Sequence, residues 1–260
     1  MKTLLPTHAW GIRPILFHIG SISVSSYSFF VTLGFLVGLT VYLWEAKKSK
    51  SFGESNLYIV FGALIGSAIG AKLLDLIVDY RYFLTNFWNV ETIFYGKTII
   101  GGLIGGAIGV KITKKIYKIE GKRGNLFAPA IAIGVAIGRL GCFLRGCCYG
   151  KPTSLPWGVN FGDGILRHPT QIYESIFMLA MFFYLEKIKN KPDIKPGQLF
   201  KILMVSYFTF RFFIEFIRVD EIAFWGLTSF QIISLFAIIY LIRDNLKNLL
   251  LKLKTNYGKQ

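Results

Sequence analysis

The stretch LFAPAIAIGVAIGRLGCFL, residues 126–144, contains a single charged side chain, Arg139. A helix of about 20 apolar residues is long enough to cross the roughly 30 Å hydrocarbon core of a bilayer. A charged group at that depth costs at least a few kcal/mol, so it usually faces an interior cavity with a partner or a ligand. The stretch therefore predicts a membrane-spanning helix that carries a functional arginine.

Similar apolar runs recur along the chain. We expect spans near 22–44, 57–79, 98–117, 126–144, 171–185, 198–217 and 226–242. Of the 260 residues, 53% are hydrophobic and 24 are phenylalanine, which is more apolar surface than a soluble domain of this size can cover. The expected fold class is all-α: a polytopic membrane protein of about seven transmembrane helices, forming one domain over residues 1–260.

A net charge of +16 would suggest a nucleic-acid partner in a soluble protein, but its placement here indicates membrane orientation. Alternate loops and the C-terminal tail hold 18 basic residues: Lys47, Lys48, Lys50, Lys111, Lys114, Lys115, Lys118, Lys122, Arg123, Lys187, Lys189, Lys191, Lys195, Arg243, Lys247, Lys252, Lys254 and Lys259. The opposite side holds 8: Lys2, Arg13, Arg81, Lys97, Arg145, Lys151, Arg167 and Arg218. The positive-inside rule then predicts the N-terminus outside and the C-terminus in the cytoplasm, with membrane lipids rather than nucleic acid as partners.

Two segments repeat a glycine pattern, GALIGSAIGAK (62–72) and GGLIGGAIGVK (101–111). Glycines four residues apart lie on one helix face and allow two helices to approach closely. Close helix packing is the simpler interpretation, and a smooth wall beside a lipid groove is the alternative. Between these glycines, Lys72 and Asp75 are three residues apart and are expected to pair.

The segment FRFFIEFIR (210–218) places Arg211, Glu215 and Arg218 on one helical face, at offsets of four and seven. A structural salt bridge between Arg211 and Glu215 is one interpretation, but it leaves the charge of Arg218 unexplained. A planar guanidinium suits bidentate binding of phosphate. A neighbouring carboxylate can hold that guanidinium in place or act as a base.

The segment GRLGCFLRGCCYG (138–150) surrounds Arg139 with glycines. We expect these glycines to break the helix at the outer membrane boundary and to expose backbone N–H groups that bind an anion beside the arginine: Gly138, Gly141, Gly146 and Gly150. An ordinary glycine-rich helix end is the alternative.

The segment RHPTQIYES (167–175) opens the fifth span after an extracytoplasmic loop at 145–170. Thr170 is expected to cap the helix, and Gln171 and Glu174 lie three apart near one face. Capping does not explain why three more polar or aromatic residues gather at the same interface: Arg167, His168 and Tyr173.

The three cysteines, Cys142, Cys147 and Cys148, form a C-x4-CC pattern. Two adjacent cysteines cannot easily both bind one metal ion, and no His or Asp stands at ligand spacing nearby. No metal site and no cofactor are therefore expected. The thiols are either small packing groups or redox-active groups at the outer face.

Taken together, GRLGCFLRGCCYG, RHPTQIYES and FRFFIEFIR resemble, in that order, the bacterial prolipoprotein diacylglyceryl transferases. GGLIGG (101–106) and SYSFFVTLGF (26–35) are similar to further segments of this family, so the resemblance covers roughly residues 20–240. It implies a multi-pass enzyme of the bacterial cytoplasmic (inner) membrane with phosphatidylglycerol and a preprolipoprotein lipobox peptide as partners. The lipobox thiol would attack a glyceryl carbon, forming a thioether and releasing glycerol-1-phosphate.

The resemblance also implies roles for individual residues. Arg139 matches the family's phosphatidylglycerol-binding arginine and Gly150 its motif-closing glycine. Arg211 and Glu215 match an essential arginine and glutamate, and Tyr27 a tyrosine of the first span. We accordingly expect the catalytic group to be Arg211, Glu215 and Tyr27, and the substrate-binding group to be Arg139, Gly150, Arg218, Arg167, Gln171 and Glu174.

The chain departs from the family pattern at three positions. Ile100 stands where the family usually has a histidine proposed to take part in proton transfer, and Cys142 and Cys147 stand where it usually has an asparagine and a glutamate. Glu215 then becomes the leading candidate for the base. These departures favour the first alternative function, a divergent transferase of the same fold with another acceptor or lipid.

The second alternative is a transporter or lipid-binding membrane protein, whose intramembrane Arg/Glu pairs would serve an ion or substrate path. Such proteins are typically built from two inverted halves with broken helices. The repeat at 62–72 and 101–111 instead joins adjacent spans.

Overall fold

The computed structural model describes residues 12–49, 53–85, 98–121 and 123–257, with side chains for all of these except 81–83 and 244–257. Contacts divide the chain into two compact units, Met1–Glu45 with Lys122–Gln260, and Ala46–Gly121. The single domain expected over residues 1–260 stays a prediction.

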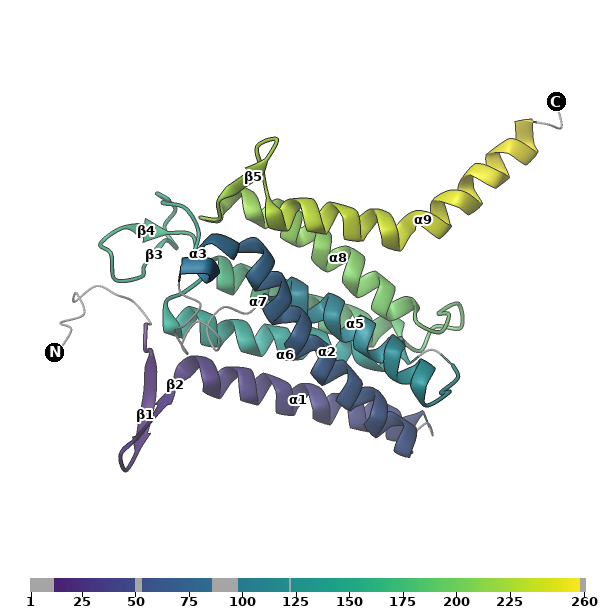
Figure 1. Cartoon of the computed structure of the whole chain (residues 1–260), viewed down its shortest axis with the longest axis horizontal. Coiled ribbons are helices and arrows are strands. Elements are labelled where there is room, and N and C mark those ends of the chain that lie inside the picture. Colours follow the sequence, from purple (N-terminus) through teal and green to yellow (C-terminus); the bar gives the residue numbers. More distant parts are fainter. Residues whose placement is uncertain (1–11, 50–52, 86–97, 122, 258–260) are drawn as a thin grey trace. The chain divides into compact units, whose positions relative to one another are not determined.

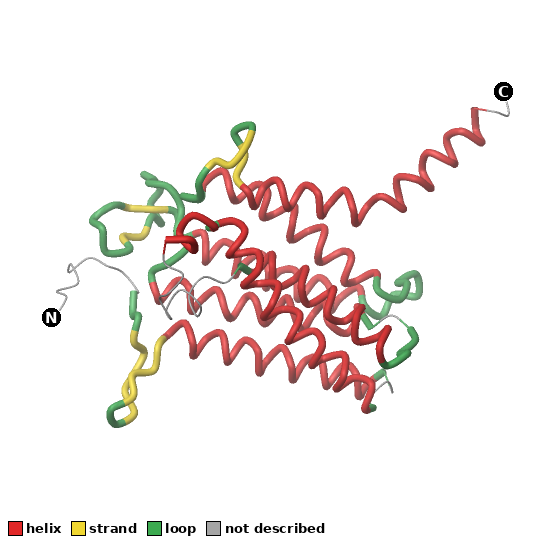
Figure 2. Tube along the Cα trace, viewed as in Figure 1, coloured by secondary structure: helices red, strands yellow, loops and turns green. Residues whose placement is uncertain are grey.

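The first unit contains α1 (Ser26–Lys48) as far as Glu45, α6 (Gly124–Arg145), α7 (Thr170–Ile188), α8 (Gln198–Ile214) with a 3₁₀ turn η1 (Glu215–Ile217), and α9 (Ser229–Tyr257) (Figure 1). The second unit contains α2 (Glu54–Val78), α3 (Tyr80–Thr85) and α5 (Ile99–Ile116). Three antiparallel hairpins complete the described chain: β1 (Ile15–Ile19) with β2 (Ile22–Ser25), β3 (Val159–Asn160) with β4 (Leu166–Arg167), and β5 (Ile222–Phe224) with β6 (Leu227–Thr228). Figure 2 shows how far helix outweighs strand, so the chain is a mostly helical protein.

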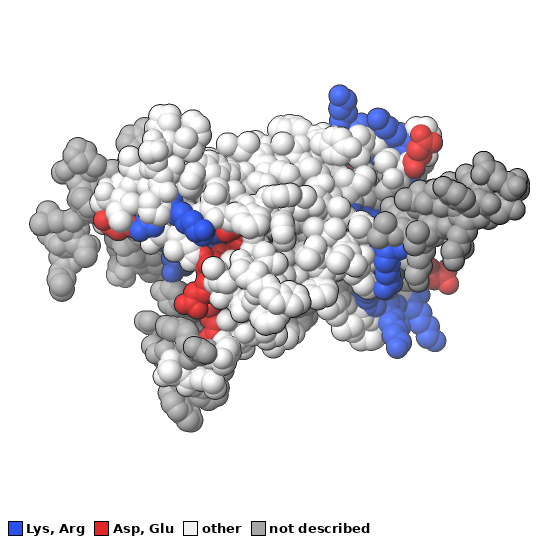
Figure 3. Space-filling view, turned by 90° about the horizontal axis from the view of Figure 1, so that it is seen from above, with Lys and Arg blue, Asp and Glu red and all other residues white. Residues whose placement is uncertain are grey.

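Helices α1, α2 and α6 are each long and apolar enough to cross a membrane, and Ser229–Arg243 of α9 is a shorter apolar helix. On the face drawn in Figure 3, the middle is largely free of Lys, Arg, Asp and Glu, which gather mostly towards its two sides. The chain is thus a membrane protein, while seven spans and the orientation of the termini stay predictions. Part of the predicted orientation pattern lies outside the described residues or side chains: Lys2, Lys50, Arg81, Lys97, Lys122, Lys247, Lys252, Lys254 and Lys259.

The first expected span, 22–44, begins too early. Residues 22–25 form β2, which pairs with β1 in the register Ile19↔Ile22 and Phe17↔Val24. Gly20 turns between the strands with φ 59°, a conformation that favours glycine. Apolar residues alternate with serines in β2, Ile22–Ser25, and this period of two favours strand over helix.

The last expected span, 226–242, also begins too early because 222–228 forms the β5–β6 hairpin. Trp225 and Gly226 both have positive φ, at 49° and 74°, which suits a tight two-residue hairpin turn. Helix α9 then starts on a capping box. The N–H of Thr228 donates to Gln231 Oε1 at 2.9 Å, and the N–H of Gln231 donates to Thr228 Oγ1 at 3.2 Å.

The expected helix break at the glycines around Arg139 is only partly correct. Gly138 and Gly141 lie inside α6, which runs unbroken to Arg145. Only Gly146 ends the helix, with φ 76°, and the backbone N–H groups of the two earlier glycines belong to the helix. No anion site of exposed N–H groups therefore forms beside Arg139 in this helix.

Glycines bring helix backbones into direct contact in both units. A Cβ atom at Gly38 of α1 would lie 2.8 Å from the carbonyl oxygen of Ala130 of α6. Within the second unit, a Cβ at Gly105 of α5 would collide with the carbonyl oxygen of Gly66 of α2. The expectation of close glycine packing is confirmed, and Lys72 pairs with Asp75 at 3.1 Å as expected.

Candidate functional site

A buried ion pair joins α6 to α7 inside the first unit. Arg139 Nη2 lies 2.7 Å from Glu174 Oε2, and the Tyr207 hydroxyl of α8 donates to Glu174 Oε1 at 2.9 Å. Glu174 lies on the buried face of α7 with Gln171 and Ser175. The Ser175 hydroxyl donates to the carbonyl of Ala136 at 2.8 Å, which holds the two helices together at this level.

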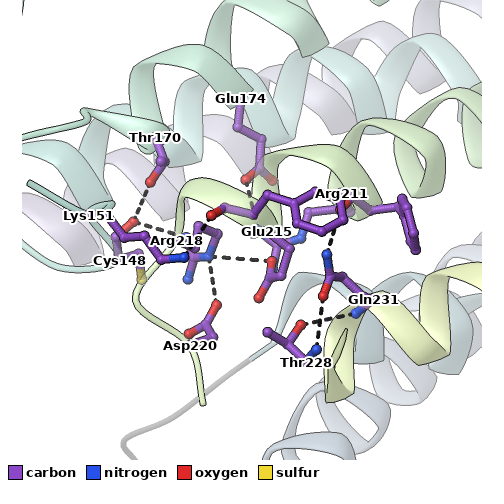
Figure 4. A network of polar contacts seen from close by, with 12 residues as sticks. Cys148, Lys151, Thr170, Glu174, Arg211, Glu215, Arg218, Asp220, Thr228 and Gln231 are labelled. Carbon is purple, nitrogen blue, oxygen red and sulfur yellow. Dashed lines mark hydrogen bonds and ion pairs between the residues drawn. The ribbon is translucent and has the colours of Figure 1, made fainter. Parts of the chain in front are cut away.

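The pair continues as a chain of alternating charges through α8 and the turn that follows it. Arg211 lies 3.7 Å from Glu174 and 2.8 Å from Glu215. Arg218 lies 3.6 Å from Glu215 and 2.8 Å from Asp220 (Figure 4). We call the whole set the ion-pair chain: Arg139, Glu174, Arg211, Glu215, Arg218 and Asp220. Three guanidinium groups meet three carboxylates, so its formal charges cancel.

The ion-pair chain leaves donors and an acceptor available to a ligand. Among the described residues, the Nε atoms of Arg139 and Arg211 are buried without a hydrogen-bond partner, as is Oε1 of Glu215. The side chains of the two arginines are 8% and 5% exposed. Buried polar atoms without partners are uncommon, and each calls for a ligand or another explanation. An anion with several oxygens is the natural partner for two guanidinium groups held this close.

The segment after α6 is fixed against the same chain of charges. Arg218 Nη1 donates to the carbonyl of Cys148 at 2.9 Å, and the Thr170 hydroxyl donates to that carbonyl at 2.7 Å. Gln171 Nε2 donates to the carbonyl of Cys147. Thr170 therefore does not cap α7 as expected. Its hydroxyl is committed to the neighbouring segment, and the residue before the helix is Pro169.

Gly150 lies where no other residue fits. Its backbone pairs with Arg218 and its N–H donates to the carbonyl of His168 at 2.9 Å. An added Cβ would lie 2.5 Å from the Ile217 carbonyl oxygen and 2.8 Å from the His168 Cβ. Glycine at this position lets three segments meet beside Arg218.

Two of the candidate residues lie apart from the ion-pair chain. Arg167 pairs with Asp163 at 2.6 Å and lies over the Tyr149 ring, in the hairpin of β3 and β4. Tyr27 is in the first turn of α1, where the guanidinium of Arg145 lies 5.2 Å from the centre of its ring. The structure thus brings together Arg139, Gly150, Gln171, Glu174, Arg211, Glu215 and Arg218, and leaves Arg167 and Tyr27 outside this group.

Sequence reasoning missed Tyr207 and Asp220. Tyr207 is four residues before Arg211, so it extends the stripe of Arg211, Glu215 and Arg218 by one turn. Asp220 follows Arg218 by two residues, after the helix has ended, so helical spacing could not find it. The spacing that points to Tyr207 was present in the sequence, whereas finding Asp220 needed the geometry of the turn.

An apolar hollow of about 560 Å³ lies beside the first turns of α7. Its walls are Phe143, Trp157, Val159, Pro169, Ile172, Tyr173 and Ile176. The indole N–H of Trp157 donates to the Tyr173 hydroxyl at 2.7 Å, which fixes the loop residue to the helix. An apolar pocket therefore adjoins the helix that carries Glu174.

Comparisons with known proteins show which proteins this chain is similar to. A family model described as prolipoprotein diacylglyceryl transferase matches residues 14–243. A phosphatidylglycerol--prolipoprotein diacylglyceryl transferase of Clostridium tetani is 35% identical over 241 residues, covering 88% of this chain and 94% of the relative. One from Finegoldia magna is 33% identical, covering 86% and 91%. A phosphatidylglycerol--prolipoprotein diacylglyceryl transferase 2 of Clostridium perfringens is 31% identical, covering 88% and 92%.

Proposed function

Since the chain belongs to the prolipoprotein diacylglyceryl transferase family, we propose that it transfers the diacylglyceryl group of phosphatidylglycerol to the lipobox cysteine of a prolipoprotein. The thiol sulfur attacks the glyceryl carbon that carries the phosphate, a C–S bond forms, and the C–O bond to the phosphate breaks. Glycerol-1-phosphate leaves and the thiol proton goes to a base. The reaction balances without an oxidant, a reductant or a cofactor.

The observation that carries the proposal is the pair of buried arginines whose Nε atoms have no partner among the described residues. The phosphate of phosphatidylglycerol is an anion with several oxygens, and it becomes a dianion when glycerol-1-phosphate leaves. Arg139 and Arg211 supply fixed donors for that charge, and donors held in place before the reaction favour the transition state. Glu174 supports this role, since it pairs with both guanidinium groups and holds them at one level.

Glu215 is the base in this proposal. Its Oε2 pairs with Arg211 at 2.8 Å, while its Oε1 has no hydrogen-bond partner among the described residues. A carboxylate with one oxygen anchored and the other available is suited to accept the proton of an incoming thiol. The family histidine is replaced by Ile100 in this chain, so the proton needs such an alternative acceptor.

The remaining candidate residues surround this centre. Arg218, Gln171 and Gly150 fix the Cys147–Gly150 segment beside the charges, which supports their role in substrate binding. Tyr27 and Arg167 keep the roles that the family resemblance implies, Tyr27 in catalysis and Arg167 in binding the acceptor or headgroup. Neither contacts the ion-pair chain, so their contribution is expected to be smaller.

The same proposal includes the membrane setting. All seven apolar segments cross the bacterial inner membrane as one domain, with the N-terminus outside and the C-terminus in the cytoplasm. The α6 end at Arg145 and the segment after it then face the outer side, where prolipoproteins present the lipobox. The preprolipoprotein peptide approaches from that side, and phosphatidylglycerol approaches from the bilayer.

Genetic complementation tests the function. A bacterium depleted of its own diacylglyceryl transferase should grow when this chain is expressed, and its lipoproteins should regain the lipid modification by mass. The Arg139→Ala variant, expressed to the same level, should not rescue growth. Stable expression of the wild-type chain without rescue and without lipid on any lipoprotein would contradict the proposal. Rescue by Arg139→Ala would contradict the role of Arg139 alone.

A further inference from the structure

The proposed reaction leaves the three cysteines of the 138–150 segment without a role. All three are free thiols. Helix α6 ends in a Schellman motif: the N–H of Gly146 donates to Phe143 O at 2.9 Å, and the N–H of Cys147 donates to Cys142 O at 3.2 Å. This motif brings together the side chains at the two ends of the longer bond. Those two residues are Cys142 and Cys147.

The exposure of the three thiols increases along the chain. Cys142 is buried, Cys147 is half-buried and Cys148 is exposed. The sulfur of Cys147 lies 3.6 Å from the carbonyl oxygen of Cys142. Cys148 follows Cys147 directly, and its carbonyl is held by Thr170 and Arg218. The three thiols therefore lie in one short segment, with Cys142 and Cys147 at the two ends of one Schellman bond.

Two arginines of the ion-pair chain border this cluster. Arg139 Nη1 lies 3.8 Å from the sulfur of Cys142, and Arg218 Nη1 donates to the carbonyl of Cys148. Hydrogen bonds from the thiols of Cys142 and Cys147, and then the charges of Arg139 and Arg218, lower the pKa of the Cys148 thiol well below its usual range. The thiols of Cys142 and Cys148, and then burial, raise the pKa of the Cys147 thiol. The thiolate, which is the reactive form, is thus favoured on the exposed cysteine.

We propose that this cluster is a thiol–disulfide switch, in which Cys148 reacts first with an external low-molecular-weight disulfide and Cys142 and Cys147 end as an internal disulfide. Cysteines on the outer side of a bacterial membrane meet an oxidising environment, in which such bonds form and persist. The redox state of the cluster therefore follows that environment, and the cluster lies beside Arg139 and Arg218 of the ion-pair chain.

The exchange balances in three steps. The Cys148 thiolate attacks a disulfide RSSR, which forms Cys148–S–SR and releases one RS⁻. Cys142, after its proton passes to that RS⁻, attacks the Cys148 sulfur and releases the second RS⁻. Cys147, after its proton passes to the second RS⁻, attacks the Cys142 sulfur and releases Cys148 as a thiolate. Two protein thiols are oxidised and RSSR is reduced to two RSH.

The favoured thiolate explains both the first and the last step. A thiol of low pKa is ionised at neutral pH, and it is also a good leaving group in exchange. The final pair, Cys142–Cys147, requires little backbone movement because the Schellman motif already brings the two residues together. This pairing also avoids a bond between the adjacent Cys147 and Cys148.

The consequence for activity rests on the proposed function. The sulfur of Cys142 is the acceptor that Arg139 Nη1 contacts at 3.8 Å. A disulfide with Cys147 redirects this sulfur, so Arg139 loses a contact that helps to orient it towards the headgroup. Oxidation should therefore lower lipid transfer, and reduction should restore it.

Mass spectrometry tests the switch directly. The purified full-length protein is treated with oxidised glutathione, its remaining thiols are alkylated with N-ethylmaleimide, and it is digested with trypsin. Cleavage after Arg139, Arg145 and Arg167 separates Cys142, on peptide 140–145, from Cys147 and Cys148, on peptide 146–167. We expect a disulfide between these peptides through Cys147, with the alkyl group on Cys148.

Three variants complete the test. Cys142→Ser should abolish the cross-link, and Cys148→Ser should slow its formation by about tenfold or more, because it removes the ionised thiol. Cys147→Ser should leave the cross-link on Cys148. A wild-type protein with all three cysteines alkylated, a cross-link through Cys148, or a bond between Cys147 and Cys148 would each overturn the proposal.

Transfer activity is measured in the same samples. The oxidised wild-type protein should lose transfer and regain it after reduction, whereas Cys142→Ser should be insensitive to oxidised glutathione. A cross-linked protein with unchanged transfer would overturn the regulatory role. A reduced protein without any transfer would instead count against the proposed function, and the cross-linking result would still stand by itself.

Discussion

The guanidinium of Arg139 and the carboxylate of Glu174 lie 2.7 Å apart, and their side chains are 8% and 2% exposed. This contact ties the fourth predicted span to the fifth at the level of the proposed lipid site. Removing one partner of a buried pair typically costs about 3–5 kcal/mol, because the other charge is left uncompensated.

Glu174→Gln should therefore lower both stability and activity. The amide still accepts the hydrogen bond from Tyr207 but no longer balances Arg139 and Arg211. Thermal unfolding in detergent, followed by tryptophan fluorescence, and diacylglyceryl transfer would measure the two effects. Glu186→Gln is the matched control, since Glu186 lies near the other end of α7 and pairs with Lys189. Equal behaviour of the two variants would rule out a special role for Glu174.

Glu215→Gln should reduce transfer by about 10²–10⁴-fold, the usual contribution of a general base. The amide preserves the shape of the side chain but cannot take the thiol proton. Initial rates with purified protein would measure this, and Glu221→Gln, an exposed position in the following loop, provides the control. Full transfer by Glu215→Gln would exclude Glu215 as the base.

Cys148 should react with iodoacetamide at a lower pH than an ordinary cysteine. Hydrogen bonds from Cys142 and Cys147, followed by the charges of Arg139 and Arg218, lower its pKa, so the thiolate persists as pH falls through the usual thiol range. The alkylation rate should rise with pH and reach its plateau at a lower pH in the folded protein than in the denatured protein. Arg218→Gln should shift that plateau to higher pH. Identical profiles for the folded and denatured protein would show that the cluster does not activate Cys148.

Gly105→Ala should destabilise the α2–α5 pair. Its Cβ would meet the backbone of Gly66 and Gly70, and overpacking of this kind typically costs about 1–3 kcal/mol. Gly106→Ala is the neighbouring control, because its Cβ would come no closer than 3.3 Å to Ala63 O. The melting temperature in detergent should fall for the first variant and change much less for the second. A larger fall for Gly106→Ala would contradict the packing described.

The sequence was sufficient to predict the helices and much of the site. Continuous apolar runs marked every long helix of the described chain, and the offset of four predicted that Arg211 and Glu215 pair. The shared helical face was wrong for Arg218, because α8 ends at Ile214 and Arg218 reaches Glu215 from an extended residue after the 3₁₀ turn. Where β-branched and small residues preceded a span, as at Ile22–Ser25, hydropathy alone extended the helix too far. The predicted spans 22–44 and 226–242 therefore began a few residues too early.

What the sequence could not supply was the pairing between helices. Glu174 and Arg139 are 35 residues apart, and nothing in either segment indicates that they meet. Thr170 is a reasonable capping residue by local rules, yet its hydroxyl bonds to Cys148 O because the segment after α6 folds back onto α7. Tertiary contacts of this kind override local preference, and they also decide that Arg167 pairs with Asp163 instead of joining the ion-pair chain.

The most direct measurement is transfer by the purified protein from phosphatidylglycerol, labelled in its glyceryl moiety, to a synthetic lipobox peptide. The wild-type protein should add one diacylglyceryl group to the cysteine peptide, none to the matched serine peptide, and release one glycerol-1-phosphate per transfer. Arg139→Ala should abolish transfer, and Arg139→Lys, which keeps the charge but loses the planar guanidinium, should restore little of it. A folded wild-type protein that leaves the cysteine peptide unmodified, or transfer that is unchanged in Arg139→Ala, would contradict the account.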